Sequence, residues 1–266
     1  MSGMKRFLLL LMILTAASSV LSSAAGAEQE IVFRMDQVYE SEIEGVIHYN
    51  LYVPDSYDGS VPYALYVALP GWGGLYFQGV GSDLREPFPY AGPEYNPEMI
   101  VVSPQLNDWG ETSARQAIAL TEYLMGTYAI DPGRVYISGY SGGGETLSIV
   151  LGICPELYTA ALHVSSQWDG NLAVLADAKT PLYLFIGEDD DYYGSDSVKE
   201  TYAALAKLYR EKGLTDEAID RLLVMDIKDA AWFAQRNARS QHGGGGLAAR
   251  EADIMNWLFS QRKETP

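Results

Sequence analysis

Short, continuous apolar runs recur along the chain, and each has the length of a strand rather than that of a typical helix. The runs cover residues 63–69, 99–103, 134–138, 158–164, 181–186 and 223–227. Strands in a parallel sheet show such uninterrupted runs, because helices pack against both faces of the sheet. The pattern therefore predicts a set of buried strands.

Segments with helical patterns separate these runs. Residues 111–128 and 195–212 repeat apolar positions at helical spacing, and residues 143–153, 214–223 and 247–259 also read as helices. Strands that alternate with helices predict an α/β fold with a doubly wound, mostly parallel sheet and helices on both faces.

The N-terminal part of this pattern is different. Residues 30–40 and 46–53 alternate between apolar and polar positions, and residues 54–59 close the second run as a turn. We expect these two strands to form an antiparallel edge of the sheet. No linker or repeat interrupts the pattern, so we expect one catalytic domain over residues 28–266.

The first 27 residues have the pattern of a secretion signal. Lys5 and Arg6 precede an apolar stretch at 7–14, and Ala25-Gly26-Ala27 forms an A-x-A cleavage site. We expect cleavage near Ala27 and a secreted or extracytoplasmic protein with no stable membrane association. An uncleaved membrane anchor is the alternative, but about eight continuous apolar residues are too few to span a bilayer. No cysteine lies near the site, so a lipoprotein anchor is not indicated.

The composition is that of an acidic globular protein. The chain has 18 basic and 35 acidic residues, a net charge of −17, and loss of Lys5 and Arg6 with the signal would leave −19. Such a surface repels nucleic acid and anionic lipid, so neither is an expected partner, but it identifies no substrate. Cys154 is the only cysteine, which excludes an intramolecular disulfide, and its apolar surroundings predict a core residue rather than a nucleophile.

Gly139-Tyr140-Ser141-Gly142-Gly143 has the G-x-S-x-G pattern of a nucleophile elbow. A buried strand precedes it and a helix of small and apolar residues follows, as that turn requires. The hydroxyl of Ser141 would then stand above the carboxyl end of the sheet, beside N–H groups at a helix N-terminus. The alternative is a glycine-rich turn without chemistry.

A serine nucleophile needs a histidine base within hydrogen-bond reach. Of the three histidines, His48 lies in the early edge strand and His163 lies inside a buried run. His242 lies in a polar, glycine-rich loop before the last helix, and only this histidine fits the order Ser…Asp…His. A surface role for His242 is the alternative.

The carboxylate that orients the histidine is expected after the run 181–186, which ends in Glu188-Asp189-Asp190-Asp191. Active sites of α/β sheets lie at the carboxyl ends of their strands. Asp190 is the preferred candidate, because Glu188 and Asp189 lie nearest the strand. Asp191 and Asp189 remain open, as does an acidic surface turn without a catalytic role.

An oxyanion hole should combine the N–H after the nucleophile, that of Gly142, with one from an earlier strand-to-helix loop. The glycine-rich segment 70–74 occupies that place, and Trp72 is the expected second donor. A glycine-rich surface turn is again the alternative. Nothing in this chemistry requires a metal or an organic cofactor, so no cofactor is expected.

Segments in this order resemble known enzymes. The segment 69–74 looks like the L-H-G-x-G-G loop of α/β-hydrolases, and 130–144 resembles the elbow of secreted esterases of the feruloyl esterase and polyhydroxybutyrate depolymerase-like branch, which is related to the catalytic domain of prolyl oligopeptidases. The segment 186–190 is similar to the G-x-x-D segment that carries the acid in that branch, which favours Asp190. His242 before Trp257-Leu258 matches the end of the family. The resemblance implies the α/β-hydrolase fold and serine hydrolase activity.

One position departs from the family pattern. Pro70 stands where the family usually has a histidine that braces the oxyanion loop, so the resemblance leaves open how this loop is held rigid.

Aromatic residues on the loops at the catalytic edge suggest a substrate-binding surface. We expect Trp109, Tyr140 and Trp168 to contact the substrate, since aromatic rings stack against aryl or sugar groups. Simple packing is the alternative in a chain with 12% aromatic residues. Residues 166–180 are too few for a large lid, so an open cleft is expected.

These features together predict a serine esterase that acts outside the cytoplasm on small-molecule or polysaccharide-linked esters. Carbohydrate-linked or aryl esters are the expected substrates. A prolyl oligopeptidase-type serine peptidase is an alternative, although no segment of the size of a propeller domain precedes the expected fold. A non-catalytic carbohydrate-binding protein on the same scaffold is the third possibility.

Overall fold

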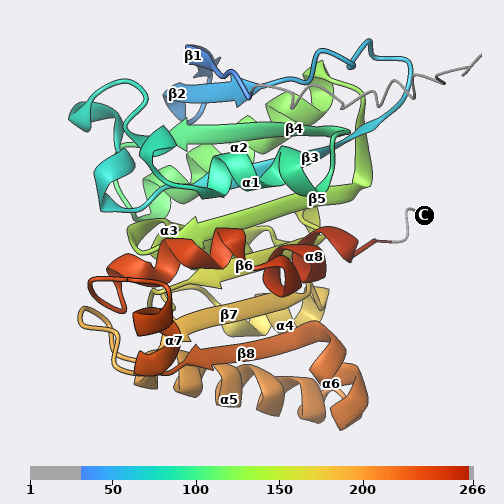
Figure 1. The fold of residues 1–266 in the computed structure, drawn as a ribbon. Helices are drawn as coiled ribbons and strands as arrows, with labels where there is room; N and C mark the ends of the chain where they lie inside the picture. Colours follow the sequence, from blue (N-terminus) through green and yellow to red (C-terminus); the bar gives the residue numbers. More distant parts are fainter. Residues whose placement is uncertain (1–30, 264–266) are drawn as a thin grey trace, which may run out of the picture. The chain divides into compact units, whose positions relative to one another are not determined.

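The computed structural model describes residues 31–263, which form an eight-stranded sheet with helices on both faces (Figure 1). The strand order is β1-β2-β4-β3-β5-β6-β7-β8. The strands are β1 (Arg34–Ser41), β2 (Gly45–Tyr52), β3 (Tyr63–Leu69), β4 (Met99–Gln105), β5 (Ile130–Tyr140), β6 (Ala160–Val164), β7 (Leu182–Gly187) and β8 (Leu223–Lys228).

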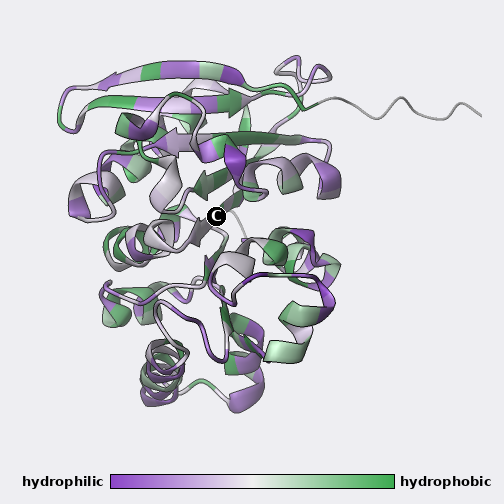
Figure 2. Cartoon of the chain, turned by 60° about the vertical axis from the view of Figure 1, so that its left-hand side comes forward, coloured by the Kyte–Doolittle hydropathy of each residue, from purple (hydrophilic) through white to green (hydrophobic). Residues whose placement is uncertain are grey.

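The sheet is parallel from β4 to β8, and only the N-terminal edge is antiparallel. β2 pairs antiparallel with both β1 and β4, whereas β3 pairs parallel with β4 and β5. Figure 2 shows the edge hairpin alternating between hydrophobic and hydrophilic residues, while the central strands are mainly hydrophobic. The predicted doubly wound sheet with its antiparallel edge is therefore confirmed.

Helices cover the two faces of this sheet and enclose two separate cores. In Figure 1, α1 (Phe88–Tyr95) and α8 (Ala252–Ser260) lie in front of the sheet, with α7 (Ala230–Gln235). Behind it lie α2 (Glu111–Thr127), α3 (Gly142–Ile153), α4 (Leu172–Ala178) and α5 (Asp196–Glu211), and α6 (Asp216–Leu222) follows α5. Successive residues of a central strand, such as Leu65 and Tyr66, face opposite cores, which explains the continuous apolar runs.

Most elements end within a few residues of the predicted boundaries, and two of the differences have a structural cause. β5 begins at Ile130 instead of residue 134, because the register with β3 shifts between Tyr63 and Leu65 and so accommodates Pro132-Gly133 within the strand. The predicted helix 247–259 is two elements, a 3-10 helix at Gly243–Arg250 and α8, separated by the extended residue Glu251.

Three short helices, α1, α4 and α7, were not predicted. α1 contains two prolines and a glycine, and its formation depends on packing, since Gly92 lies against Tyr66, Met99 and Val101 of the sheet. Polar caps begin the other two: Asn171 accepts a hydrogen bond from the N–H of Ala173, and Asp229 accepts one from Trp232.

Two expectations from the sequence concern export and the membrane. The predicted signal at residues 1–27 falls outside the described residues. No helix within residues 31–263 has the length and apolar character needed to cross a membrane.

Cys154 caps the end of α3 and is half-buried rather than fully in the core, and burial raises the pKa of its thiol to about 11.

Candidate active site

Ser141 occupies a sharp turn between β5 and α3, at the carboxyl end of the parallel strands. Its φ of 53° and ψ of −123° are unusual for a residue with a side chain, so the backbone is strained there. Gly139 permits the close crossing of strand and helix: a Cβ on it would lie 2.2 Å from the carbonyl oxygen of Gly143. The elbow geometry therefore presents the Ser141 hydroxyl at the edge of the sheet.

The structure brings Ser141, His242 and Asp190 together from three loops. Ser141 Oγ lies 3.0 Å from His242 Nε2, and His242 Nδ1 lies 3.1 Å from both carboxylate oxygens of Asp190. The Asp190 side chain is fully buried, and its Oδ1 also accepts the N–H groups of Tyr192 and Tyr193 at 3.0 Å. This is the connectivity that a serine hydrolase needs: nucleophile, base and orienting carboxylate.

The neighbouring acids have different positions. Asp191 accepts the backbone N–H of His242 at 3.0 Å, and so holds the loop rather than the imidazole ring. The exposed Asp189 contributes only its backbone N–H, which donates to the side chain of Gln241. Among the three candidates, only Asp190 therefore contacts the histidine ring.

The glycine-rich loop after His242 packs closely against the elbow. A Cβ on Gly245 would lie 2.4 Å from the Ser165 hydroxyl and 2.7 Å from the Tyr140 ring, so a side chain does not fit there. Gly245 thus has a packing role, because the absence of a side chain lets the histidine loop approach Ser165 and Tyr140.

Tyr140 supports the histidine loop and does not line the pocket beside Ser141, which corrects its predicted role in substrate binding. Its hydroxyl donates to the carbonyl oxygen of His242 at 2.9 Å, and its ring stacks on the imidazole with centroids 5.9 Å apart. The residue before Ser141 thereby positions His242.

Removing the Tyr140 hydroxyl should therefore loosen the histidine loop. We expect Tyr140→Phe to lower kcat about 3- to 10-fold, since one hydrogen bond contributes about 1 kcal/mol. Tyr136→Phe is the matched control, because that hydroxyl on the same strand donates to Phe259 and Gln261, away from the site. Equal kcat values for the two variants would argue against this role of Tyr140.

The two predicted oxyanion donors begin two helical turns. Trp72 is the first residue of the 3-10 helix η1 (Trp72–Gly74), and Gly142 is the first residue of α3. Within the described residues, neither N–H donates a hydrogen bond to another protein group. Both therefore remain available to an oxyanion in the pocket.

Glu86 braces the loop that carries Trp72, at the place where the family histidine is missing. The N–H of Gly71 donates to Glu86 Oε1 at 2.8 Å, and a Cβ on Gly71 would lie within 3.2 Å of both Glu86 and Tyr140. Burial, together with the nearby Asp83, raises the pKa of Glu86 to about 8, and the hydrogen bond from the Gly71 N–H opposes this rise. The bracing group is thus a carboxyl from the following loop.

This arrangement makes stability depend on pH. The unfolded chain releases the Glu86 proton near 4.5, whereas the folded chain retains it up to about pH 8, so the folded state binds more protons in between and its stability falls as pH rises. Glu86→Gln should reduce this fall by at least about 1.4 kcal/mol, the equivalent of one pKa unit. Urea unfolding of both proteins across that pH range measures the difference.

Glu86→Ala tests the brace itself. We expect kcat to fall about 10-fold with little change in KM, because the oxyanion loop loses its acceptor, while the amide oxygen of Glu86→Gln restores most of the activity. Equal activity of the two variants would show that the contact does not position the loop.

A pocket of about 360 Å³ opens beside Ser141. It is lined by Trp72, Trp109, Ser141, Gly142, Glu145, Tyr192, Tyr193 and His242. Trp109 forms the wall against the oxyanion donor, since a Cβ on Gly142 would lie 2.2 Å from its indole ring. Trp109 therefore lies where the sequence analysis placed it, whereas Glu145 was missed, although its position one helical turn after Ser141 is readable in the sequence.

Trp168 lies elsewhere, which corrects its predicted place in the substrate pocket. Its indole N–H donates to the carbonyl oxygen of Gly170, and its ring packs near His163. It lines a separate depression with residues of α5, such as Ser197 and Glu200. The loop 165–170 turns the tryptophan away because the indole N–H is satisfied within the loop itself.

The other two histidines have local roles. His163 is buried in β6, its Nε2 lies 3.0 Å from the Gln167 carbonyl oxygen, and burial lowers its pKa to about 4. His48 lies in β2, where its Nδ1 is 2.8 Å from Asp36 and its ring stacks on Tyr76. Neither contacts Ser141, in agreement with the elimination made from the sequence.

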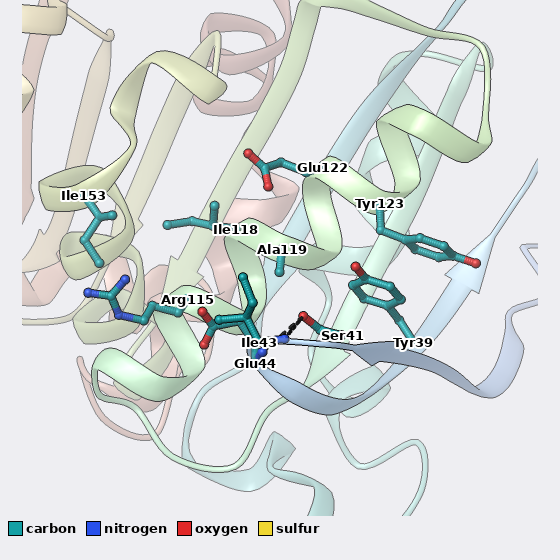
Figure 3. Close-up of a pocket in the computed structure, with 10 residues that line it drawn as sticks. All are labelled: Tyr39, Ser41, Ile43, Glu44, Arg115, Ile118, Ala119, Glu122, Tyr123 and Ile153. Atoms are coloured by element: carbon teal, nitrogen blue, oxygen red, sulfur yellow. Dashed lines mark hydrogen bonds between the residues drawn. The ribbon is translucent and has the colours of Figure 1, made fainter.

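A second cavity, of about 270 Å³, lies between the β1–β2 hairpin and α2 (Figure 3). Its lining residues include Tyr39, Ile43, Arg115 and Tyr123, and it shares none with the pocket beside Ser141. Among residues 31–263, no cluster of three or more His, Cys, Asp or Glu side chains is arranged to hold a metal ion.

Comparisons with known proteins relate this geometry to two enzyme groups. Residues 105–231 match the prolyl oligopeptidase family. No curated protein matches the sequence.

Solved structures extend the similarity to nearly the whole described chain. A thermostable esterase has 22% identity and a TM-score of 0.71, over 87% of this chain and 63% of its own length. A feruloyl esterase module from Clostridium thermocellum, complexed with sinapinate, has 16% identity and a TM-score of 0.59, over 88% and 90%. Oligopeptidase B from Leishmania major has 13% identity and a TM-score of 0.56, over 86% and 36%.

The chain thus spans less than two thirds of the thermostable esterase and about a third of the peptidase. Esterases and a peptidase are both similar to this chain in fold, so the fold does not separate the two activities. The chain therefore has the fold of the α/β-hydrolases, and its residues 105–231 match the prolyl oligopeptidase family.

Proposed function

We propose that this hydrolase is a serine esterase in which Ser141 is the nucleophile, His242 the general base and Asp190 the residue that orients His242. The observation that carries the proposal is the continuous chain of contacts from Ser141 Oγ through the imidazole to the buried carboxylate. A buried acid on Nδ1 holds the ring in the tautomer whose Nε2 accepts the serine proton, and it stabilises the imidazolium that then forms.

The reaction follows from these positions. Ser141 Oγ attacks the ester carbonyl carbon while His242 Nε2 takes the hydroxyl proton, and the N–H groups of Gly142 and Trp72 donate to the oxyanion. When the tetrahedral intermediate collapses, His242 returns the proton to the departing alcohol and an acyl-serine remains. Water, deprotonated by His242, then attacks the acyl-serine, and His242 returns that proton to Ser141 Oγ as the carboxylic acid leaves. Each oxyanion donor is worth roughly 3–4 kcal/mol in such reactions.

The lining of the pocket supports an ester with an aryl or carbohydrate group. Trp72 and Trp109 offer ring faces beside the nucleophile, and such faces stack on flat or ring-shaped groups. Sinapinate, an aryl acid, is the ligand named for the similar feruloyl esterase module. This part of the proposal concerns the class of ester and does not extend to one compound.

Peptide hydrolysis is the second candidate, because the family match is to prolyl oligopeptidases. Rates on p-nitrophenyl acetate and aryl esters, compared with rates on peptide anilides, separate the two functions. We expect the esters to be hydrolysed with at least about 100-fold higher kcat/KM. Faster cleavage of the anilides would replace the esterase proposal by the peptidase.

A non-catalytic binding protein on this fold is the third candidate. A fluorophosphonate probe reacts only with an activated serine, so labelling of Ser141 followed by peptide mapping distinguishes it from an enzyme. Absence of labelling would favour the binding protein.

We also propose that the protein is exported and that its leader is removed near Ala27. The basic residues, apolar stretch and A-x-A site of the leader support this. N-terminal sequencing of protein from the culture medium or periplasm should begin at Glu28, whereas an intact Met1 in the cytoplasm would contradict export.

A further inference from the structure

Glu145 places a carboxylate in the pocket beside the nucleophile, and the mechanism above does not use it. It lies one helical turn after Ser141 on α3 and is the only Asp or Glu among the pocket residues. No lysine or arginine among the described residues lines this pocket. His242 is its single basic group, so a charged substrate meets mainly the carboxylate.

The position of this carboxylate relative to the triad is fixed. The hydroxyl of Tyr193 donates to Glu145 Oε1 at 2.7 Å, and the N–H of Tyr193 donates to Asp190. Tyr193 therefore links the triad acid to the pocket acid, and burial together with Glu145 raises the pKa of the Tyr193 hydroxyl. Glu145 Oε2 makes no hydrogen bond within residues 31–263 and remains an open acceptor.

Four aromatic side chains, of Trp72, Trp109, Tyr192 and Tyr193, line the same pocket as Glu145, and two of them are largely uncovered. The side chains of Trp72 and Tyr192 are 67% and 73% exposed, although such large rings are normally covered. Their faces and that of Trp109 carry negative electrostatic potential, which attracts cations. A carboxylate together with such ring faces is a site for a cation of modest size, such as an ammonium group.

The wider surroundings add to the same potential. Glu188, Asp189 and Asp191 lie next to Tyr192 in the loop that bears the triad acid, and all three are exposed. The chain as a whole carries a net charge of −17. A positively charged ester is therefore attracted to this edge of the sheet, and an anionic ester is repelled.

We infer that Glu145 is a specificity-determining residue, and that the preferred ester carries an ammonium group that lodges between Glu145 and the rings of Trp72, Trp109 and Tyr192. This inference rests on the proposed esterase function. It identifies the charge of the substrate group beside the scissile bond, which the fold and the triad leave open. If Glu145 served only to hold Tyr193, substrate charge would not matter.

Matched isosteric esters test the inference. On the alcohol side, the 2-(trimethylammonio)ethyl thioacetate cation is compared with neutral 3,3-dimethylbutyl thioacetate. On the acyl side, the p-nitrophenyl ester of 4-(trimethylammonio)butyrate is compared with that of 5,5-dimethylhexanoate, and the p-nitrophenyl monoester of glutarate supplies an anion. We expect wild type to favour the cation in at least one pair by about 10-fold or more in kcat/KM, and to hydrolyse the anion most slowly.

Glu145→Gln keeps the acceptor for Tyr193 but removes the charge. We expect the ratio of cationic to neutral kcat/KM to fall to within about threefold of unity, and added salt to lower the same ratio in wild type. Glu217→Gln, an exposed acid on α6 that does not line the pocket, is the matched control and should retain both the wild-type ratio and the basal rate.

Each outcome has a distinct meaning. Wild type that hydrolyses esters without preference for the cation, or Glu145→Gln that retains the preference, overturns the inference while the esterase proposal stands. Wild type that hydrolyses none of these esters, or p-nitrophenyl acetate, overturns the esterase proposal instead. The wild-type series alone decides the question if Glu145→Gln does not fold.

Discussion

Replacement of Ser141 by alanine should lower kcat for ester hydrolysis by about 10⁶-fold and leave KM nearly unchanged. The side chain is almost fully buried at the elbow, and alanine keeps its Cβ, so the pocket walls stay in place. What disappears is the oxygen that lies 3.0 Å from His242 Nε2. Stopped-flow or initial-rate measurements with p-nitrophenyl acetate give both constants.

The matched control for this nucleophile is Cys154→Ala. Burial raises the pKa of this thiol to about 11, so little thiolate is present at neutral pH, and the residue ends α3 at the opposite end from Ser141. We expect this variant to keep wild-type activity. Substantial activity in Ser141→Ala, with thermal unfolding like that of wild type, would reject Ser141 as the nucleophile.

Replacement of Asp190 by asparagine should lower kcat by about 10⁴-fold. Asparagine fills the same buried space, but its amide cannot both accept the Nδ1 proton and compensate the charge of the imidazolium. The wrong tautomer of His242 then faces Ser141. Because the side chain is fully buried, water cannot supply a substitute acceptor. Initial rates from pH 5 to 10 measure the loss.

The adjacent acids provide matched variants. Asp191→Asn retains an acceptor for the backbone N–H of His242, so we expect about a 3-fold change. Asp189→Asn should have no effect, because that side chain is exposed and does not contact the histidine. A larger loss for Asp191→Asn than for Asp190→Asn would show that Asp191, and not Asp190, orients His242.

The strands could be predicted because each central strand is covered on both faces. That burial leaves an uninterrupted apolar run, as at 63–69, whatever the neighbouring elements are. Short helices have no comparable sequence pattern. α1, with the sequence FPYAGPEY, lacks helical propensity and forms because Gly92 fits against Met99 and Tyr66. Its existence depends on tertiary packing, which overrides local preference.

The site shows the same division. The elbow is local, so Ser141 and Gly142 could be identified from five consecutive residues. Trp168 and Tyr140 were assigned to the pocket because both lie on loops at the catalytic edge. The direction of a loop side chain depends on its hydrogen-bond partners. Here the indole N–H of Trp168 donates to the Gly170 carbonyl, and the hydroxyl of Tyr140 donates to the His242 carbonyl.

Glu86 and Glu145 show what only contacts between distant segments reveal. Glu86 is 15 residues from Gly71, and Glu145 is 48 residues from Tyr193. Neither spacing forms a recognisable motif, since acidic residues are common in a chain with 35 of them. The buried brace of the oxyanion loop and the charged wall of the pocket therefore became visible only in three dimensions.

The sequence by itself determined the alternation of strands and helices, the elbow, and the order of Ser141, the acidic run 188–191 and His242 along the chain. These follow from periodic burial and from backbone geometry that only certain residues permit. The tertiary structure alone decided which of three adjacent aspartates reaches His242 and which aromatic rings face the nucleophile. Those choices depend on directions of side chains that differ by one position along a turn, and such directions are set by partners far away in the chain.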